Sequence, residues 1–80
     1  IFSFASLPKA QRLLKEALAA DPGFNDAKLA LASNYRLMSW TGIMKEDEAQ
    51  RQSLPLIEQV LESDPGNYLA RALKLQTEKH

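Results

Sequence analysis

The 80-residue chain contains no cysteine and a single histidine, and these scarcities exclude much of the chemistry that proteins perform. Without a thiol there is neither a disulfide nor a thiolate nucleophile, so the composition fits a cytoplasmic or a periplasmic protein equally well. The only imidazole belongs to His80 at the last position, where chain ends fray. One terminal histidine does not supply the several ligands that a metal ion requires, so we expect no metal site.

Net charge is also missing, because ten basic residues balance ten acidic ones. A nucleic-acid-binding surface needs an excess of Lys and Arg, so we expect no nucleic-acid partner. No apolar run approaches the length of a membrane span, and we therefore expect a soluble chain without membrane insertion. The three glycines, Gly23, Gly42 and Gly66, lie too far apart for a phosphate-binding loop.

The carboxylates do not form a pattern typical of a catalytic site. Glu46, Asp47 and Glu48 are consecutive, so they spread around a helix start, where they complement the positive end of the helix dipole. Glu58 and Glu62 share a helix face that we expect to be solvated. The sequence therefore predicts no enzyme activity, no catalytic residue and no cofactor.

Eighty residues can form one small domain, and 45% hydrophobic with 25% charged residues is an ordinary globular composition. The chain begins at Ile1 and not at a methionine, which favours a piece of a longer protein. Its first five residues, IFSFA, lack a basic flank and are too short for a signal peptide. Phe2 and Phe4 lie in this segment, which we interpret as a hydrophobic edge.

Apolar residues recur at helical spacing through most of the chain, and no stretch alternates as a β-strand would. We expect an all-α fold of about four antiparallel helices in one domain, residues 1–80. The predicted helices cover about 7–20, 25–41, 47–63 and 68–77.

Several residues favour particular helix ends. Ser6 can cap the first helix, and Pro8 suits its first turn, where a missing N–H costs little. Asp47 and Gln50 have the spacing of a capping box at the start of the third helix. Pro55 lies inside the apolar pattern of that helix, where it either kinks or divides it.

The tripeptide Asp-Pro-Gly occurs twice, at 21–23 and at 64–66, each time between two predicted helices. The copies are 43 residues apart, and their surroundings align. In this alignment Leu18 falls on Leu61, Ala27 on Ala70 and Lys28 on Arg71. A fixed recurrence of helix, Asp-Pro turn and helix is the signature of a helical repeat array.

With these residues the chain, over 7–76, resembles the tetratricopeptide repeat (TPR) family, in which a proline closes each two-helix repeat. The resemblance implies a TPR-like α-solenoid fragment. It implies that the packing residues of an outer helix are Ala10, Leu14 and Ala17. Those of the next inner helix are Leu31, Ala32 and Tyr35.

The second copy of the pattern departs from the family. Ser53 stands where alanine is usual, and Lys74 and Glu78 stand where the inner helix would carry leucine and tyrosine. The last helix is therefore either a terminal cap or the end of the repeat pattern. The repeat is also about nine residues longer than the usual 34. The longer segment, LMSWTGIMKEDEAQRQ, is similar to elongated TPR-like regions of winged-helix transcriptional regulators and nucleotide cyclases.

The resemblance also implies a ligand-facing surface on the inner helix. Arg36 is its strongest candidate, because a guanidinium can hold a carboxylate in a two-pronged geometry; the alternative is an ordinary solvated or ion-paired arginine. Trp40 is either an interaction hot spot or a core residue that closes a helix pair. The family's Lys and Asn clamp for C-terminal carboxylates is replaced by Leu29 and Ser33, so no such clamp is expected. The expected partner-binding residues are Asp26, Leu29, Ser33, Arg36, Leu37 and Trp40.

Two functions follow from this interpretation. The first is a non-catalytic module that binds a protein or peptide, or a second copy of itself, because fewer than two full repeats leave hydrophobic ends to be covered. The alternative is a regulatory, sensor or dimerisation segment of a larger transcriptional regulator or signalling protein.

Overall fold

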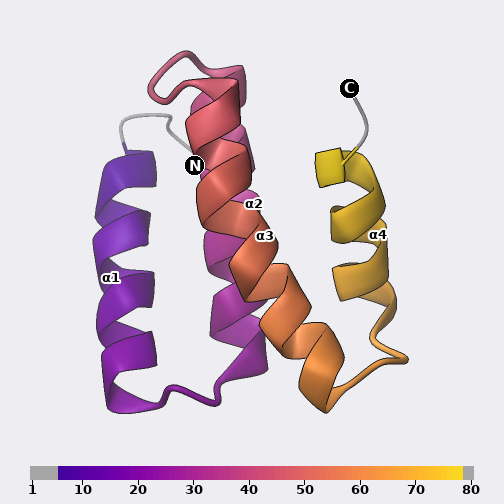
Figure 1. The fold of residues 1–80 in the computed structure, drawn as a ribbon. Helices are drawn as coiled ribbons and strands as arrows, with labels where there is room; N and C mark the ends of the chain where they lie inside the picture. The colour runs from indigo at the N-terminus through magenta and orange to yellow at the C-terminus, as the bar shows by residue number, and fades with distance from the viewer. Residues whose placement is uncertain (1–5, 79–80) are drawn as a thin grey trace.

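The computed structural model describes residues 6–78, which form an all-α fold of four helices with no strand in that range (Figure 1). Their bounds agree with the predicted ones to within one residue at each end. Ile1, Phe2, Phe4 and His80 lie outside the described residues. The helices are α1 (Leu7–Ala20), α2 (Asn25–Trp40), α3 (Glu46–Ser63) and α4 (Tyr68–Glu78).

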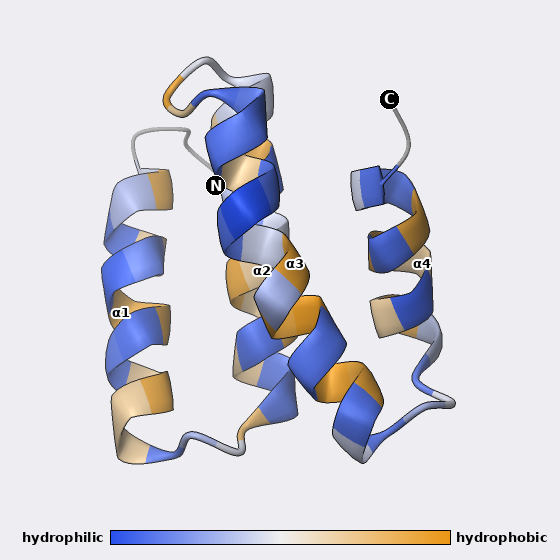
Figure 2. Cartoon of the chain, in the orientation of Figure 1, coloured by the Kyte–Doolittle hydropathy of each residue, from blue (hydrophilic) through white to orange (hydrophobic). Residues whose placement is uncertain are grey.

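The helices pack in chain order. α2 contacts both α1 and α3, α4 packs on α3, and a smaller contact joins α4 to α2. In Figure 1, α1 and α4 lie on opposite sides of the central pair made by α2 and α3. The apolar bands of α1 lie on its side toward α2 in Figure 2, while its hydrophilic residues face outward. None of the helices in residues 6–78 combines the length and the apolarity needed to cross a membrane.

The two Asp-Pro-Gly turns have the same hydrogen-bonding pattern. The aspartate ends each preceding helix with nearly the same backbone angles, φ −140° and ψ 86° at Asp21 and φ −144° and ψ 79° at Asp64. In each turn the proline occupies the second position, which its fixed φ suits. Each turn has three equivalent bonds from a backbone N–H to a backbone carbonyl. In the first turn they join Asp21 to Ala17 (2.9 Å), Phe24 to Asp21 (3.1 Å) and Lys28 to Phe24 (3.1 Å). In the second turn they join Asp64 to Val60 (2.8 Å), Asn67 to Asp64 (3.1 Å) and Arg71 to Asn67 (3.1 Å). The sequence repeat is therefore also a structural repeat.

The helix starts differ from the predicted ones in their capping. Ser6 precedes α1 but makes no side-chain capping hydrogen bond, whereas Pro8 lies in the first turn as expected. At α4 the capping residue is Asn67, whose Oδ1 accepts a hydrogen bond of 2.9 Å from the amide of Ala70. That bond satisfies one of the amides that a helix start leaves unpaired.

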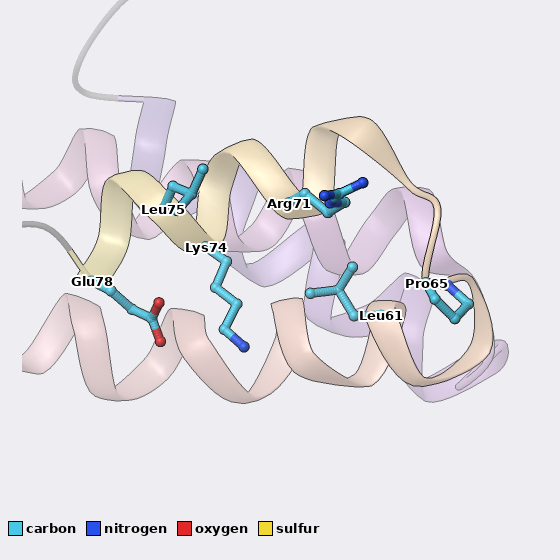
Figure 3. Close-up of a pocket in the computed structure, with 6 residues that line it drawn as sticks. All are labelled: Leu61, Pro65, Arg71, Lys74, Leu75 and Glu78. Atoms are coloured by element: carbon cyan, nitrogen blue, oxygen red, sulfur yellow. The ribbon is translucent and has the colours of Figure 1, made fainter.

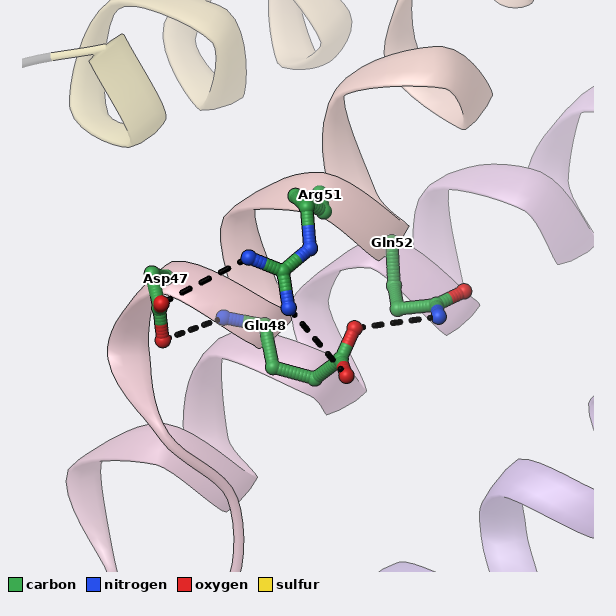
Figure 4. Close-up of polar contacts among 4 residues, drawn as sticks. All are labelled: Asp47, Glu48, Arg51 and Gln52. Atoms are coloured by element: carbon green, nitrogen blue, oxygen red, sulfur yellow. Dashed lines mark hydrogen bonds and ion pairs between the residues drawn. The ribbon is translucent and has the colours of Figure 1, made fainter.

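The predicted capping box of Asp47 and Gln50 is wrong, because α3 begins one residue earlier than expected. Lys45 precedes its first turn, and no side-chain cap forms there. Asp47 instead lies inside the helix, where it accepts a hydrogen bond of 2.9 Å from the amide of Glu48. Its carboxylate also pairs with Arg51 at 3.5 Å, as Figure 4 shows. Because both partners are largely exposed, this pair contributes less than about 1 kcal/mol.

The end of α2 is set by Gly42, as predicted. Gly42 has φ 83°, in the left-handed region that favours glycine. The amide of Ile43 donates to the carbonyl of Met38 (2.9 Å), and the amide of Gly42 donates to the carbonyl of Ser39 (3.2 Å). These two bonds form a Schellman motif, which satisfies carbonyls left free at the end of a helix.

Pro55 does not divide α3, which is continuous from Glu46 to Ser63. The proline ring is exposed, on the side of the helix away from the core. It removes only the hydrogen bond that its own amide would have made to the carbonyl four residues earlier. Of the two predicted outcomes, a kink or a division of the helix at Pro55, the division is therefore excluded.

Two buried clusters hold the helices together. One cluster joins α2, α3 and α4 and contains Leu29, Ala32, Ile57, Val60, Ala70 and Leu73. The other joins α1, α2 and the start of α3 and contains Leu7, Leu31, Tyr35, Met38 and Ala49. Tyr35 is 2% exposed, which confirms the predicted core position.

Two buried polar side chains fit into this core because both are hydrogen-bonded. Nδ2 of Asn34, on α2, donates to the carbonyl of Leu7 at 2.9 Å and so ties α1 to α2. The hydroxyl of Ser53 is fully buried and donates to the carbonyl of Ala49 at 2.6 Å. A second acceptor, the carbonyl of Ala32, lies 3.4 Å from the same hydroxyl. This serine, which stands where the resemblance to the TPR family would place alanine, is therefore satisfied within the core.

We expect Ile57→Ala to lower the free energy of unfolding by about 2–5 kcal/mol, because the fully buried side chain would leave a cavity in the first cluster. Leu75→Ala is the matched control: Leu75 is 71% exposed, so its truncation should cost less than about 0.5 kcal/mol. Urea denaturation followed by circular dichroism measures both values. Equal effects of the two substitutions would contradict this packing.

Candidate binding site between α2 and α4

The structure places the six predicted binding residues in three different environments. Asp26 is exposed in the first turn of α2, and Ser33, Arg36 and Leu37 are partly buried along the same helix. Trp40, the last residue of α2, is 69% exposed. The interpretation of this tryptophan as a core residue is therefore wrong.

Leu29 was expected to face a ligand, and this expectation is wrong for this fold. Its side chain is 3% exposed and belongs to the cluster shared by α2, α3 and α4. Ile57 and Val60 of α3 belong to the same cluster. A partner cannot contact Leu29 without separating these helices.

Arg36 and Trp40 form one unit with a residue of α4. The guanidinium carbon of Arg36 lies 4.9 Å from the centroid of the Trp40 ring, a cation–π geometry. Nη1 of the same guanidinium donates to Oε1 of Gln76 at 2.6 Å, across 40 residues of chain. The arginine is thus held between an aromatic face on α2 and an amide on α4, and its partner here is a neutral side chain.

Two depressions adjoin this unit, and Arg36, Trp40 and Gln76 line both of them. The larger has a volume of about 230 Å³, and its lining also includes Ser33, Leu37 and Leu73. The smaller has a volume of about 100 Å³ and extends toward the start of α3. We call the two together the α2–α4 site.

Thr77 places an unsatisfied polar group beside the smaller depression. The residue is 8% exposed, and its hydroxyl has no hydrogen-bond partner within the described part of the chain. Its backbone carbonyl, by contrast, accepts a hydrogen bond of 3.2 Å from Nε2 of Gln50 on α3. A buried hydroxyl without a partner costs about 1–3 kcal/mol, so this group lowers the stability of the fold.

The sequence interpretation did not assign Leu73, Gln76 and Thr77 to the site. The internal repeat contained the signal, because a shift of 43 residues carries Ser33 to Gln76 and Asn34 to Thr77. The ligand-facing positions implied by the TPR resemblance lie in residues 25–41 alone, whereas the structure adds residues of α4 as the second half of the site.

A third depression, of about 380 Å³, lies between α3 and α4 and has a structural explanation (Figure 3). Leu61, Lys74 and Glu78 line it. Lys74 and Glu78 occupy the positions at which α2 packs Leu31 and Tyr35 against α1. Because charged side chains replace a leucine and a tyrosine, the contact between α3 and α4 is left partly unfilled.

The side chains that line the α2–α4 site are of types that can recognise a ligand. No group of three or more His, Cys, Asp or Glu side chains in this range is placed to hold a metal ion. The α2–α4 site offers an aromatic face, a guanidinium, an amide and a hydroxyl around an apolar floor. Such a set can hold an apolar side chain and a polar group next to it.

No protein-family model, curated protein or solved structure matches the chain.

We expect Arg36→Gln to lower the free energy of unfolding by about 0.5–1 kcal/mol, because it removes the cation–π contact with the largely exposed Trp40 ring. It should also increase the quenching of Trp40 fluorescence by acrylamide, since the guanidinium no longer covers one face of the ring. Trp40 is the only tryptophan, so the signal is unambiguous. Arg12→Gln on α1 is the control, and an equal rise in quenching there would contradict the contact.

Proposed function

We propose that this chain is a TPR-like helical-repeat module without catalytic activity, which binds a protein or peptide segment at the α2–α4 site. The observation that carries the proposal is the joint placement of Arg36, Trp40 and Gln76 on two helices 40 residues apart in the chain. Large exposed aromatic residues with an arginine are enriched at the energetic centres of protein interfaces.

The repeat supports the proposal by giving α2 and α4 the same role. Ala27 and Ala70, which align in sequence, are 4% and 0% exposed. Both helices follow an Asp-Pro-Gly turn with the same hydrogen bonds. In the TPR interpretation these are the two inner helices, whose shared surface is the ligand-binding side of the array.

The partner is best described by the groups it must present. An apolar side chain fits the 230 Å³ depression against Leu37, Leu73 and Trp40. A carboxylate beside it would replace the Gln76 amide oxygen as the acceptor for Arg36, because a charged acceptor gives the stronger hydrogen bond. These features favour a segment with an acidic residue next to a large apolar one.

The test is a selection from a phage-displayed peptide library, followed by titration of the selected peptides against the protein with Trp40 fluorescence as the signal. We expect acidic-apolar sequences to be enriched. Trp40→Ala and Arg36→Gln should each weaken binding by about 1.4 kcal/mol or more, which is at least a tenfold rise in the dissociation constant. Because Trp40→Ala removes the fluorophore, its binding is measured by calorimetry. Arg12→Gln should leave affinity unchanged.

Thr77→Val separates binding from stability. Removing the buried, unpaired hydroxyl should leave the protein at least as stable as the parent, and the affinity for the selected peptides should stay unchanged. A library that yields no binder, or binders indifferent to Arg36 and Trp40, would refute the proposed site.

A further inference from the structure

The outer face of α4 carries large apolar side chains that nothing in residues 6–78 covers. Tyr68 is 85% exposed and Leu75 is 71% exposed, and the exposed Ala72 lies between them at helical spacing. This stripe lies on the opposite side of the helix from the buried Ala70 and Leu73. In Figure 3, Leu75 points away from α3. We call Tyr68, Ala72 and Leu75 the α4 stripe.

The internal repeat identifies the kind of element that fits the α4 stripe. A shift of 43 residues carries the stripe onto Asn25, Leu29 and Ala32 of α2. That face of α2 is covered by the next helix, α3. Nδ2 of Asn25 donates to the hydroxyl of Ser63 at 3.0 Å, and the carbonyl of Ala32 lies 3.4 Å from the hydroxyl of Ser53. By this equivalence the α4 stripe fits a helix of the same type as α3.

α1 is such a helix, and it carries an exposed stripe of the required kind. The residues of α3 that face α2 or pack beside it are Ser53, Leu56, Val60 and Ser63. The same shift carries them onto Ala10, Leu13, Ala17 and Ala20, which we call the α1 stripe. Leu13 is 55% exposed and Ala20 is exposed, because α2 packs against the neighbouring face of α1 through Leu7, Leu14 and Leu18.

We propose that two copies of this chain associate head to tail, with the α1 stripe of one copy packed on the α4 stripe of the next. In this arrangement α1 of the second copy packs on α4 of the first copy in the same way as α3 packs on α2 within one copy. The two stripes lie apart from the α2–α4 site, so this proposal is independent of the proposed function.

The sizes of the facing side chains are complementary. α4 has the larger residues of the repeat, since Tyr68 replaces Asn25 and Leu75 replaces Ala32. α1 has the smaller residues at the facing positions, since alanine replaces Ser53, Val60 and Ser63 of α3. Leu13 is the one large residue of its stripe, and Ala72 is the one small residue of the other. Knobs on each helix therefore meet holes on its partner.

The contact joins two different faces, so each copy keeps one face free and association continues beyond the dimer. A single helix pair buries less than the roughly 1,200 Å² typical of stable interfaces, so we expect weak association that grows with concentration. Light scattering after size exclusion, over a dilution series to about millimolar protein, should show the weight-average mass rising above twice that of the monomer.

Leu13→Asp and Leu75→Asp test both stripes. Both side chains are mostly exposed, and circular dichroism checks that each variant keeps its helix content. Each variant alone should stay monomeric, and their equimolar mixture should form a dimer and no larger species, because each supplies the stripe that the other lacks. Leu69→Asp is the control: Leu69 is 56% exposed on α4 but outside the stripe, so it should associate like the parent.

Other outcomes overturn the proposal. A dimer lost only with Leu75→Asp would show two α4 helices paired with each other, and a parent that is monomeric throughout would show that the stripes serve another segment. Because the chain has no cysteine, cross-linking gives a second test. Leu13→Cys mixed with Ala72→Cys should yield a disulfide-linked heterodimer, and a yield no higher than with Leu69→Cys would contradict the contact.

Discussion

The burial of α2 between α1 and α3 is the constraint on which the rest of the molecule depends. Leu31 and Tyr35 pack toward α1, while Leu29 and Ala32 pack toward α3 and α4. A helix that is apolar on most sides is stable only when it has neighbours on most sides. Since α2 ends beyond this core, Trp40 projects from its last turn and leaves an aromatic face exposed beside α4. The candidate binding site is thus a consequence of how α2 is held.

The two Asp-Pro-Gly turns impose a repeat whose halves are filled unequally, and both the depression between α3 and α4 and the α4 stripe arise from that inequality. Where α2 has leucine and tyrosine, α4 has Lys74 and Glu78, and a depression opens against α3. Where α2 has Ala32 beneath a neighbouring helix, α4 has Leu75, which is exposed. The backbone geometry is repeated while the packing is not, so α4 offers unfilled surfaces on both of its sides.

Local rules predicted the helices well because proline, glycine and apolar spacing act over a few residues. They placed the end of α2 at Gly42 correctly, and the TPR resemblance placed Tyr35 correctly in the core. They do not reach side-chain exposure, which tertiary packing decides: the resemblance puts Leu29 at a ligand-facing position, and the sequence leaves Trp40 either as a core residue or as an interaction hot spot. Burial of Leu29 follows from α3 and α4 folding over it, and Trp40 is exposed because no helix within residues 6–78 covers the end of α2. The contribution of α4 to the site was foreseeable only by carrying the repeat through to Gln76.

Native-state amide hydrogen exchange tests most directly the claim that α2 is the central, most strongly packed helix. Amides between Leu29 and Tyr35 should exchange most slowly, because they open only with the loss of both clusters. Amides of α4 should exchange faster, since Lys74 and Glu78 weaken its contact with α3. If α4 were as strongly protected as α2, or if α2 exchanged as fast as α4, the account of this fold and of the site built on it would be contradicted.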